Sequence, residues 1–511
     1  MLWIALHVPR LSFESWLAAL SPDQREQPVA LMSARGVVVC NASAQRLGVR
    51  SGLKRATALA LAPHLLLGRA DAARDRQAIT SVAHVALAFT PSVSFAALST
   101  ASGSGDFGLP PVIAPCTVLL QVQASLRYFG GPEPLMRRLR AALAPLDYTV
   151  QLASAPTSQG AAMLACMAGG STGELHCADW PSLERMLEAA PVWLLGPGRE
   201  HWAALESMGL CTFGALRRLP RPGLVRRFGQ ALLDALDRVS GERPDPPCAW
   251  ITLPETFEAR IELQARADTT DQVLHGARLL IEPLLAWARA HQSRVRCFTL
   301  AMHHEPRHRQ DADIPGVSEL SIALAEPSCD ASHLSVLLRE RLAHLQLKAP
   351  TLELRLRCAD VVRGSPLSAE LFASARGERE GLVRLIERLQ ARLGPEQVQR
   401  LAPAADLRSE REGVLERTVA RAASAPRPVW LLPEPQPLPE RQSRPVLDGQ
   451  PLQLLCGPER VESGWWDAPL TERDYFIAQT RDGALVWIYR ARLPLSAVRD
   501  AQGWCLQGWF A

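Results

Sequence analysis

A pattern of strands and helices between residues 250 and 360 constrains the fold of this chain more than any other feature. Alternating apolar residues predict four strands, at "FEARIELQ", "RVRCFTLAMHH", "SELSIALA" and "TLELRLRCA". Helical spacing predicts a long helix over 270–292 after the first strand and a second helix, "ASHLSVLLRERLAHL", after the third. This β-α-β-β-α-β order matches a small split βαβ sheet.

Strands and helices also alternate over the first 165 residues. Strands are predicted at "WIALHV", "GVVVCN" (36–41), "TVLLQVQ" (117–123) and "YTVQLASA" (148–155). We expect Ser12 to cap the helix after the first strand, and a later helix to end near Gly48. Residues 185–248 change to short helices, with a Gly-Pro-Gly hairpin at 196–198. A chain of 511 residues is too long for one core, so we predict an α+β multidomain protein.

The patterns weaken beyond residue 363. "GSPLSAELFASARGERE" is polar and loop-like, and an amphipathic helix follows it and ends before Gly394. Residues 402–445 are rich in Pro, Arg and Glu, which favours a linker or an extended wrap. Residues 426–511 hold six of the 13 tryptophans, and "YFIAQTRDGALVWIYR" predicts a hairpin that turns at Asp482–Gly483. We therefore expect a small β-rich module at the end of the chain.

Composition excludes several classes of protein. The eleven cysteines are scattered without a C-x-x-C pair, which argues against a zinc site and a disulfide scaffold. No run of about 18 apolar residues and no signal-like leader is present, so we expect a reduced, cytoplasmic protein without a membrane partner. Of the 56 basic residues only Lys54 and Lys348 are lysines. A GC-rich genome explains this bias, and arginine also suits bidentate phosphate contacts.

The order of these parts resembles that of the Y-family (translesion) DNA polymerases. "PVALMSARGVVVCNASAQRLGVRSGL" is similar to the fingers segment around "YEAR-x-x-GV-x-x-GM", and "VLLQVQASLRYFGG" to the palm strand that follows the catalytic Asp-Glu pair. "LLGPGREHWAALESMGLCTFGAL" resembles the thumb helix-hairpin-helix. Within that family, "RPVWLLPEPQPL", "GPERVESGWWD", "RDYFIAQ" and "WCLQGWFA" together resemble the tail of the ImuB group, the polymerase-like subunit of the bacterial SOS mutasome.

The resemblance implies a domain assignment for nearly the whole chain. It implies a palm at 1–20 and 76–180, fingers at 21–75, a thumb at 185–248, a little finger at 250–360, a clamp-binding segment with helices at 364–425, and a β-rich partner-binding tail at 426–511.

The same resemblance locates the catalytic positions, and their acids are missing. The corner after the first strand holds His7, Pro9 and Arg10, where active members have metal-binding acids. The later Asp-Glu pair falls on Cys116 and Thr117, and no acid occurs between 107 and 132. Two-metal nucleotide addition needs clustered carboxylates. The triphosphate-holding Tyr and Arg fall on Ala42 and Gln45, and the later phosphate lysine falls near Ser158 or Gln159.

Two interpretations of this loss remain open. Losing metal ligands and triphosphate ligands together favours a pseudo-polymerase without a cofactor. Alternatively, Asp106 and Glu14 supply displaced metal ligands, and the protein is an active error-prone DNA polymerase that uses Mg²⁺. A loop aspartate such as Asp106 is more often a turn former.

The thumb region keeps the character of a DNA-binding surface. Glu206 is the only acid between Leu205 and Asp234. The basic candidates are Arg217, Arg218, Arg221, Arg226 and Arg227. Gly196 and Gly198 are expected to aim backbone amides at a phosphate. The competing interpretation is an ordinary solvated basic face that does not touch DNA, which leaves a purely structural interaction protein.

Two further segments are candidates for binding proteins. "SAELF" resembles the bacterial sliding-clamp pentapeptide, with Ser368 in place of Gln and with Leu371 and Phe372 as apolar anchors; an ordinary loop anchor is the alternative. "QPLPE" (436–440) is a second, weaker clamp candidate. The resemblance implies that the tail docks a RecA-like mutasome protein and an error-prone C-family DNA polymerase. Trp465 and Trp466 are the candidate contacts, and a buried core is the ordinary role of tryptophan.

Overall fold

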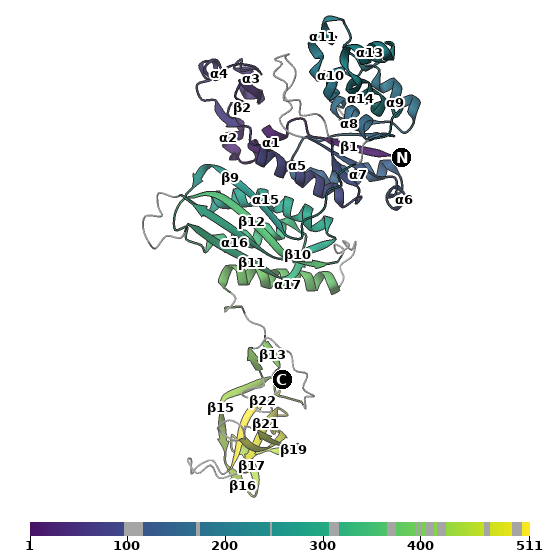
Figure 1. The fold of residues 1–511 in the computed structure, drawn as a ribbon. Helices are drawn as coiled ribbons and strands as arrows, with labels where there is room; N and C mark the ends of the chain where they lie inside the picture. The colour runs from purple at the N-terminus through teal and green to yellow at the C-terminus, as the bar shows by residue number, and fades with distance from the viewer. Residues whose placement is uncertain are drawn as a thin grey trace. The chain divides into compact units, whose positions relative to one another are not determined.

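The computed structural model divides into two compact units, residues 1–392 and residues 393–511. It describes residues 1–96, 116–169, 174–245, 248–305, 316–364, 375–394, 397–398, 401–403, 413–415, 426–463, 471–492 and 503–510. Figure 1 shows its helices and strands. The predicted α+β multidomain fold is confirmed.

The first sheet is built around the strand β1 (Trp3–His7). Its strand order is β5 (Val93–Phe95), β6 (Thr117–Gln121), β1, β7 (Gln151–Ala155) and β8 (Glu174–His176). β1 pairs antiparallel with both β6 and β7. Because β1 is central, other elements cover both of its faces. Its residues must therefore be apolar or hydrogen-bonded, and the run "WIALH" meets this requirement.

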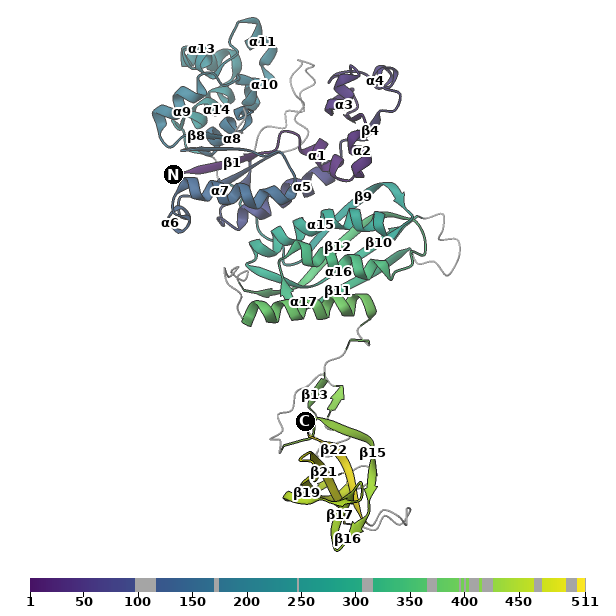
Figure 2. The ribbon, with the colours of Figure 1, turned by 180° about the vertical axis from the view of Figure 1, so that it is seen from behind.

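The two faces of β1 belong to two different cores. Ile4 and Leu6 pack with α5 (Ala72–Leu87) and α7 (Pro132–Leu143). Trp3 and Ala5 pack with α8 (Ser158–Met167), which Thr157 caps as its side chain accepts from the Gly160 amide. In Figures 1 and 2, α8 lies on one side of β1, and α5 and α7 lie on the other. Short helices α6 (Leu126–Phe129) and η1 (Ala144–Leu146) flank α7.

A small subdomain of four helices and a three-stranded sheet follows β1. Its elements are α1 (Leu11–Ala18), α2 (Pro22–Glu26), β2 (Val29–Met32), β3 (Val37–Cys40), α3 (Ala42–Arg46), α4 (Arg55–Leu61) and β4 (Leu66–Arg69), with strand order β3-β2-β4. The predicted cap at Ser12 is wrong. The helix α1 begins two residues earlier than that cap implies, at Leu11, so Arg10 occupies the N-cap position and no side chain caps the helix. Gly48 follows α3 with a φ of +89°, as a C-terminal glycine should.

Short helices fill residues 180–240, as predicted. They are α9 (Trp180–Leu187), η2 (Val192–Leu194), α10 (Gly196–Glu200), α11 (Trp202–Ser207), α12 (Phe213–Arg217), α13 (Arg221–Phe228) and α14 (Gln230–Ser240). The predicted Gly-Pro-Gly hairpin is wrong, because residues 196–198 form the first turn of α10. Gly198 is needed there for packing: an added Cβ would lie 2.2 Å from the Val192 carbonyl oxygen.

The split βαβ sheet is confirmed. Its elements are β9 (Phe257–Ala267), α15 (Thr270–Ala290), β10 (Ser293–His304), β11 (Val317–Ser328), α16 (Ala331–Ala343) and β12 (Thr351–Arg363). The strand order β11-β10-β12-β9 is antiparallel throughout, so β12 lies between the two strands that α15 connects. Apolar residues of α15, α16 and one sheet face form a single core.

One more helix, α17 (Ala375–Leu393), completes the first unit. It begins inside the stretch predicted to be a loop. Glu387 of α17 is buried, accepts from the Ala325 amide of β11, and lies 2.8 Å from the His333 Nε2 of α16. This buried carboxylate holds the helix, whereas Leu382 and Leu385 of its apolar face are about half exposed, at 51% and 52%.

The second unit is rich in β-strands, as predicted. Its elements are β13 (Leu401–Pro403), β14 (Gly413–Leu415), β15 (Trp430–Leu438), β16 (Glu440–Arg441), β17 (Arg444–Leu447), β18 (Gln450–Pro451), β19 (Gln453–Ser463), β20 (Thr471–Gln479), β21 (Leu485–Ala491) and β22 (Trp504–Trp509). β20 and β21 form the predicted hairpin around Gly483. Of the two interpretations of residues 402–445, a linker or an extended wrap, the linker is wrong over residues 430–438, because this segment is the extended strand β15 and pairs with β22 in the main sheet.

Candidate functional site and nucleic-acid interface

The two segments expected to carry catalytic acids meet at one end of the first sheet. His7 of β1 lies opposite Thr117 of β6 in the antiparallel register, and the His7 Nδ1 is 2.8 Å from the Thr117 Oγ1. The Cys116 Sγ is 3.7 Å from the same ring nitrogen. The Val8 amide donates to the Cys116 carbonyl at 2.8 Å. The fold therefore brings these positions together, and it joins them by a hydrogen bond between neutral groups.

Burial keeps this cluster uncharged. It lowers the pKa of His7 to about 4 and raises the pKa of the Cys116 thiol to about 11. It also raises the pKa of Cys166, a residue of α8 beside Thr117, to about 12. At neutral pH the imidazole is therefore neutral and both thiols keep their protons.

The side chains at this end of the sheet do not fit a magnesium site. Mg²⁺ is held by carboxylates and water, and a neutral imidazole, a hydroxyl and protonated thiols do not replace them. At the corner after β1, Pro9 and Arg10 are exposed. The Arg10 carbonyl accepts from the amides of the first turn of α1, so this corner starts a helix and adds no ligand.

Of the two acids proposed as displaced metal ligands, Glu14 is described and has a different partner. Oε2 of Glu14 accepts from the Thr149 amide at 2.9 Å, which ties α1 to the segment before β7. Asp106 lies outside the described residues. A buried acid that the sequence analysis missed is Asp75 of α5, whose Oδ1 accepts from the Ser15 hydroxyl at 3.3 Å. Burial raises the pKa of Asp75. The sequence does contain a signal for this burial, because Asp75 lies four residues before Ile79, on the apolar face of α5.

The expected triphosphate positions carry no positive charge. Ala42 and Gln45 are exposed on the short helix α3. At the position expected for the phosphate lysine, Ser158 is buried, and its amide donates to Asp245 Oδ2 at 2.9 Å. A carboxylate at the start of α8 repels a phosphate group, so this arrangement opposes triphosphate binding.

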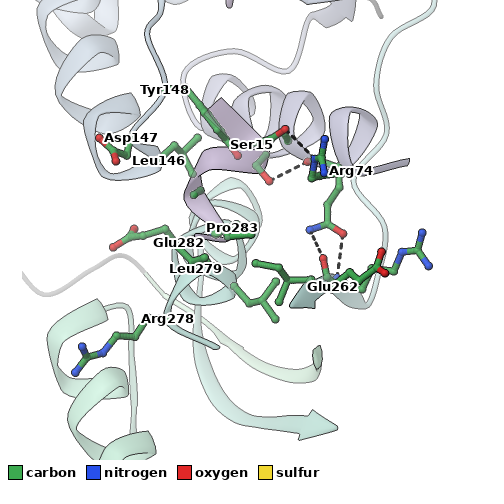
Figure 3. Close-up of a pocket in the computed structure, with 18 of the residues that line it drawn as sticks. Ser15, Arg74, Leu146, Asp147, Tyr148, Glu262, Arg278, Leu279, Glu282 and Pro283 are labelled. Atoms are coloured by element: carbon green, nitrogen blue, oxygen red, sulfur yellow. Dashed lines mark hydrogen bonds between the residues drawn. The ribbon is translucent and has the colours of Figure 1, made fainter. Parts of the chain in front are cut away.

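A cavity of about 240 Å³ lies between the helices α1 and α5 and the split βαβ sheet (Figure 3). The Arg74 Nε donates to the Ser15 Oγ at 3.2 Å on one side of it. Across the cavity the Gln77 side chain bonds both backbone groups of Arg260, at 3.0 Å each. His7, Cys116, Thr117 and Cys166 do not line this cavity. We therefore interpret the cavity as part of the interface between the helices α1 and α5 and the split βαβ sheet within the first unit.

Two of the five arginines proposed for the thumb-like region form ion pairs with acidic side chains. Arg217 pairs with Glu184 at 3.1 Å and with Glu242 at 3.0 Å. Arg221 also pairs with Glu242, at 2.8 Å, and its other nitrogen bonds Asp237. These acids lie outside the segment from Leu205 to Asp234, in which Glu206 is the only acid, so the local sequence does not reveal the pairing.

The other three thumb arginines form the free basic face. Arg218, Arg226 and Arg227 are exposed, and none of the described acids forms an ion pair with them. Gly196 and Gly198 lie in the first turn of α10, where Gly198 is buried against Val192. The structure therefore gives Gly198 a packing role.

The protein-binding candidates fall largely outside the described residues. Ser368, Leu371 and Phe372 lie there, as do Trp465 and Trp466. The weaker clamp candidate at 436–440 is described, and its apolar residue Leu438 is buried in the core of the second unit. That residue is not available as an anchor in the folded chain.

Comparison with known proteins gives a consistent result. The model of the impB/mucB/samB family matches residues 12–166. Protein ImuB of two Caulobacter vibrioides strains is 26% identical over 506 residues, which cover 91% of this chain and 100% of the relative. DNA polymerase IV of Salmonella arizonae is 28% identical over 219 residues, 41% of this chain and 56% of the relative.

Solved structures also match, at low scores. They include a Dbh ternary complex and DinB from Sulfolobus solfataricus, each 15% identical and covering 71% of this chain and 100% of theirs. The TM-scores are 0.38 and 0.37, too low to carry an argument. None of the helices in the described part of the chain is both long and apolar enough to cross a membrane.

The sheet built around β1, the split βαβ sheet and the family match over residues 12–166 define a Y-family polymerase-like protein. Within that class, the chain is similar to Protein ImuB over nearly its whole length and along the full length of that relative.

We predict that the buried His7 makes the fold acid-sensitive. The pKa of His7 is about 4 in the folded chain and 6.5 when the chain unfolds, so between pH 6.5 and about 4 the proton binds mainly to the unfolded state. The contribution of neutral His7 to the free energy of unfolding is therefore fully present above pH 6.5 and is lost as the pH drops toward 4. At pH 5.5 this loss is about 1.4 kcal/mol. In calorimetric melting at pH 7.5 and pH 5.5, His7→Asn should show a smaller drop in Tm than the wild type.

His64 provides the control because it is exposed. His64→Asn should keep the wild-type drop in Tm. An equal drop in His7→Asn and wild type would contradict the predicted role of His7.

We predict that the free thumb arginines bind DNA phosphates. Arg226→Ala/Arg227→Ala should weaken binding to primer–template DNA, because each lost phosphate contact removes about 0.9 from the slope of log K against log salt, about 1.8 for two. Fluorescence anisotropy between about 50 and 200 mM salt measures this slope. Arg217→Ala/Arg221→Ala is the matched control, since these arginines already pair with acids. Identical slopes for Arg226→Ala/Arg227→Ala and wild type would mean that the face is only solvated.

Proposed function

We propose that the chain is a non-catalytic, polymerase-like adaptor in translesion DNA synthesis and SOS mutagenesis in the cytoplasm. The observation that carries the proposal is the neutral His7–Thr117 hydrogen bond at the point where a Y-family polymerase needs its metal-binding acids. Two-metal catalysis requires carboxylates at that point, and the chain has none between 107 and 132.

The nucleotide positions support the same proposal independently. Uncharged Ala42 and Gln45 replace the groups that hold a triphosphate, and at the position of the phosphate lysine the Ser158 amide donates to the Asp245 carboxylate. An enzyme with displaced metal ligands would still need to bind the triphosphate. The bond between Glu14 and the Thr149 amide also speaks against Glu14 as a displaced ligand.

We propose that the adaptor holds primer–template DNA through Arg218, Arg226 and Arg227. These three exposed cations have no acidic partner among the described residues, which suits contacts to phosphates that position the protein without reading sequence. Arg217 and Arg221 are then part of the thumb's internal ion-pair network.

We further propose that two segments recruit proteins to this DNA. Leu371 and Phe372 would anchor "SAELF" in the groove of the sliding clamp. The C-terminal tail, with Trp465 and Trp466, would dock an error-prone C-family DNA polymerase and a RecA-like protein. The similarity to Protein ImuB over 91% of the chain supports a shared role for the tail.

Primer extension tests the absence of catalysis. The purified chain, given a primer–template, all four deoxynucleotides and Mg²⁺ or Mn²⁺, should add no nucleotide, because the His7 end of the sheet offers no metal-binding carboxylate. An active Y-family polymerase serves as the positive control. Extension that Asp106→Ala abolishes would overturn the proposal and establish the active polymerase with displaced ligands.

A pull-down with the sliding clamp tests the proposed anchor. Leu371→Ala/Phe372→Ala should lose most of the clamp that the wild type retains, because two apolar anchors supply most of the energy of such a short motif. Leu382→Ala/Leu385→Ala is the matched control, since it removes two exposed apolar side chains from α17, close by in sequence. Equal clamp recovery by wild type and Leu371→Ala/Phe372→Ala would refute the anchor.

A further inference from the structure

Helices α5 and α15 are enclosed on all sides along part of their length. Residues 81–86 of α5 and residues 284–288 of α15 are all buried. Because five consecutive residues span more than one turn of a helix, neither helix keeps a solvent face there. Figures 1 and 2 show the two helices side by side, with the first sheet on one side of the pair and the split βαβ sheet on the other. The two sheets are therefore joined through a common pair of helices.

The contact between these helices belongs to the core of the first sheet. Ala286 of α15 is 2% exposed and packs in the same core as Ile4 and Leu6 of β1. Its neighbours in the helix, Leu285 and Trp287, pack in the core of the split βαβ sheet. Since α15 contributes to both cores, separating the two sheets would expose apolar surface of each.

Residues 250–254, which precede β9, form a strap between the same two parts. Trp250 stacks on Trp3 of β1, with the ring centroids 6.2 Å apart. The Ile251 amide donates to the carbonyl of Val93, on the edge strand β5, at 2.8 Å. The beginning of the strap is therefore fixed to both the central strand and an edge strand of the first sheet.

The end of the strap is fixed to α15. The Pro254 carbonyl accepts from the indole N–H of Trp287 at 2.9 Å, and the His291 Nε2 lies 2.9 Å from the same oxygen. Three residues separate this point from Ile251 along the chain, and an extended chain of that length spans at most about 11 Å. A strap this short, fixed at both ends, leaves the split βαβ sheet little room to turn away from the first sheet.

The Gln77 side chain of α5 makes a second tie between the two parts. Arg260 lies on the edge strand β9, and both its N–H and its C=O bond the side-chain amide of Gln77, at 3.0 Å each. The amide thus satisfies the sheet edge as a neighbouring strand would, and moving β9 away from α5 would leave two unpaired backbone groups. The cavity of about 240 Å³ that Gln77 and Arg260 line is then a space inside a fixed joint.

We propose that the first sheet and the split βαβ sheet form one rigid body, closed by the strap and by Gln77, and that their arrangement does not change when the chain binds primer–template DNA. The rigidity of the free chain depends only on the shared helix pair and the two ties. The behaviour with DNA rests on the proposed DNA-binding function.

The thumb helices belong to the same rigid body. Leu224 and Phe228 of α13 pack in the core that holds Trp3 of β1. Arg226 and Arg227, which lie between these two apolar residues in the sequence, are therefore kept at a fixed distance from the split βαβ sheet. The first unit then presents its proposed DNA contacts in one constant arrangement.

A distance measurement on the full chain tests this proposal. Azide-bearing amino acids in place of Arg137 of α7 and Arg339 of α16, two exposed positions on the two parts, take up spin labels without use of the eleven cysteines. Pulsed electron paramagnetic resonance should show a single narrow distance distribution, with the same maximum before and after primer–template DNA is added. Two maxima in the free chain, or a maximum that shifts on adding DNA, would overturn the proposal.

Removing both ties should cost the chain this single narrow distribution. Gln77→Ala/Trp250→Ala removes the amide at the edge of β9 and the ring stacked on Trp3. Trp180→Ala/Gln230→Ala is the matched control, because Trp180 is as exposed as Trp250, at 46% against 47%, and lies on α9 outside the joint. Circular dichroism checks that both variants fold. If folded Gln77→Ala/Trp250→Ala keeps the wild-type distribution, the two ties do not hold the joint and the proposal is wrong.

Fluorescence anisotropy with the spin-labelled chain separates this proposal from the proposed function. A chain that binds DNA and changes its distance distribution refutes the rigid body and leaves the DNA-binding function in place. A chain that keeps one narrow distribution and binds no DNA refutes the proposed function and supports the rigid body in the free chain.

Discussion

The pairing of β1 with β6 is the interaction on which the first unit depends. β1 is the central strand, and its alternate residues enter two different cores, one with α5 and α7 and one with α8. Its last residue, His7, is tied across the register to Thr117. A change in this register by one residue would move Ile4 and Leu6 into the wrong core. The segment must therefore stay a buried strand whether or not it supports chemistry.

Because β1 must stay buried, the residues that hold the first sheet together are uncharged, and the charged residues lie elsewhere. Near the His7 cluster, burial keeps the imidazole and the thiols neutral. Positive charge without acidic partners among the described residues is instead found on exposed side chains, on helix α13 and on Arg35, Lys54, Arg55 and Arg69 around β2, α4 and β4. Such a distribution is suited to contacts with a polyanion at the surface, and poorly suited to holding cations in the interior.

Much of the fold could be predicted from the sequence because the strong signals are local. The alternation in 250–360 and the turn at Gly483 need only neighbouring residues, and both are confirmed. The site was harder, because pairing is not local. Arg217 looks free in its own window, although Glu184 and Glu242 neutralise it from 33 and 25 residues away. Asp75 was missed because its hydrogen-bond partner Ser15 lies 60 residues earlier.

The absence of carboxylates at the paired residues His7 and Thr117 is physically compatible with the fold. Carboxylates clustered at a metal site repel one another whenever the metal is absent, so they lower the stability of the scaffold that carries them. A histidine and a threonine at paired positions of β1 and β6 remove this repulsion and add a hydrogen bond of 2.8 Å. The exchange leaves the packing of Ile4 and Leu6 unchanged, because these side chains point to the opposite face of the sheet. The first sheet can therefore remain stable with uncharged side chains at this end.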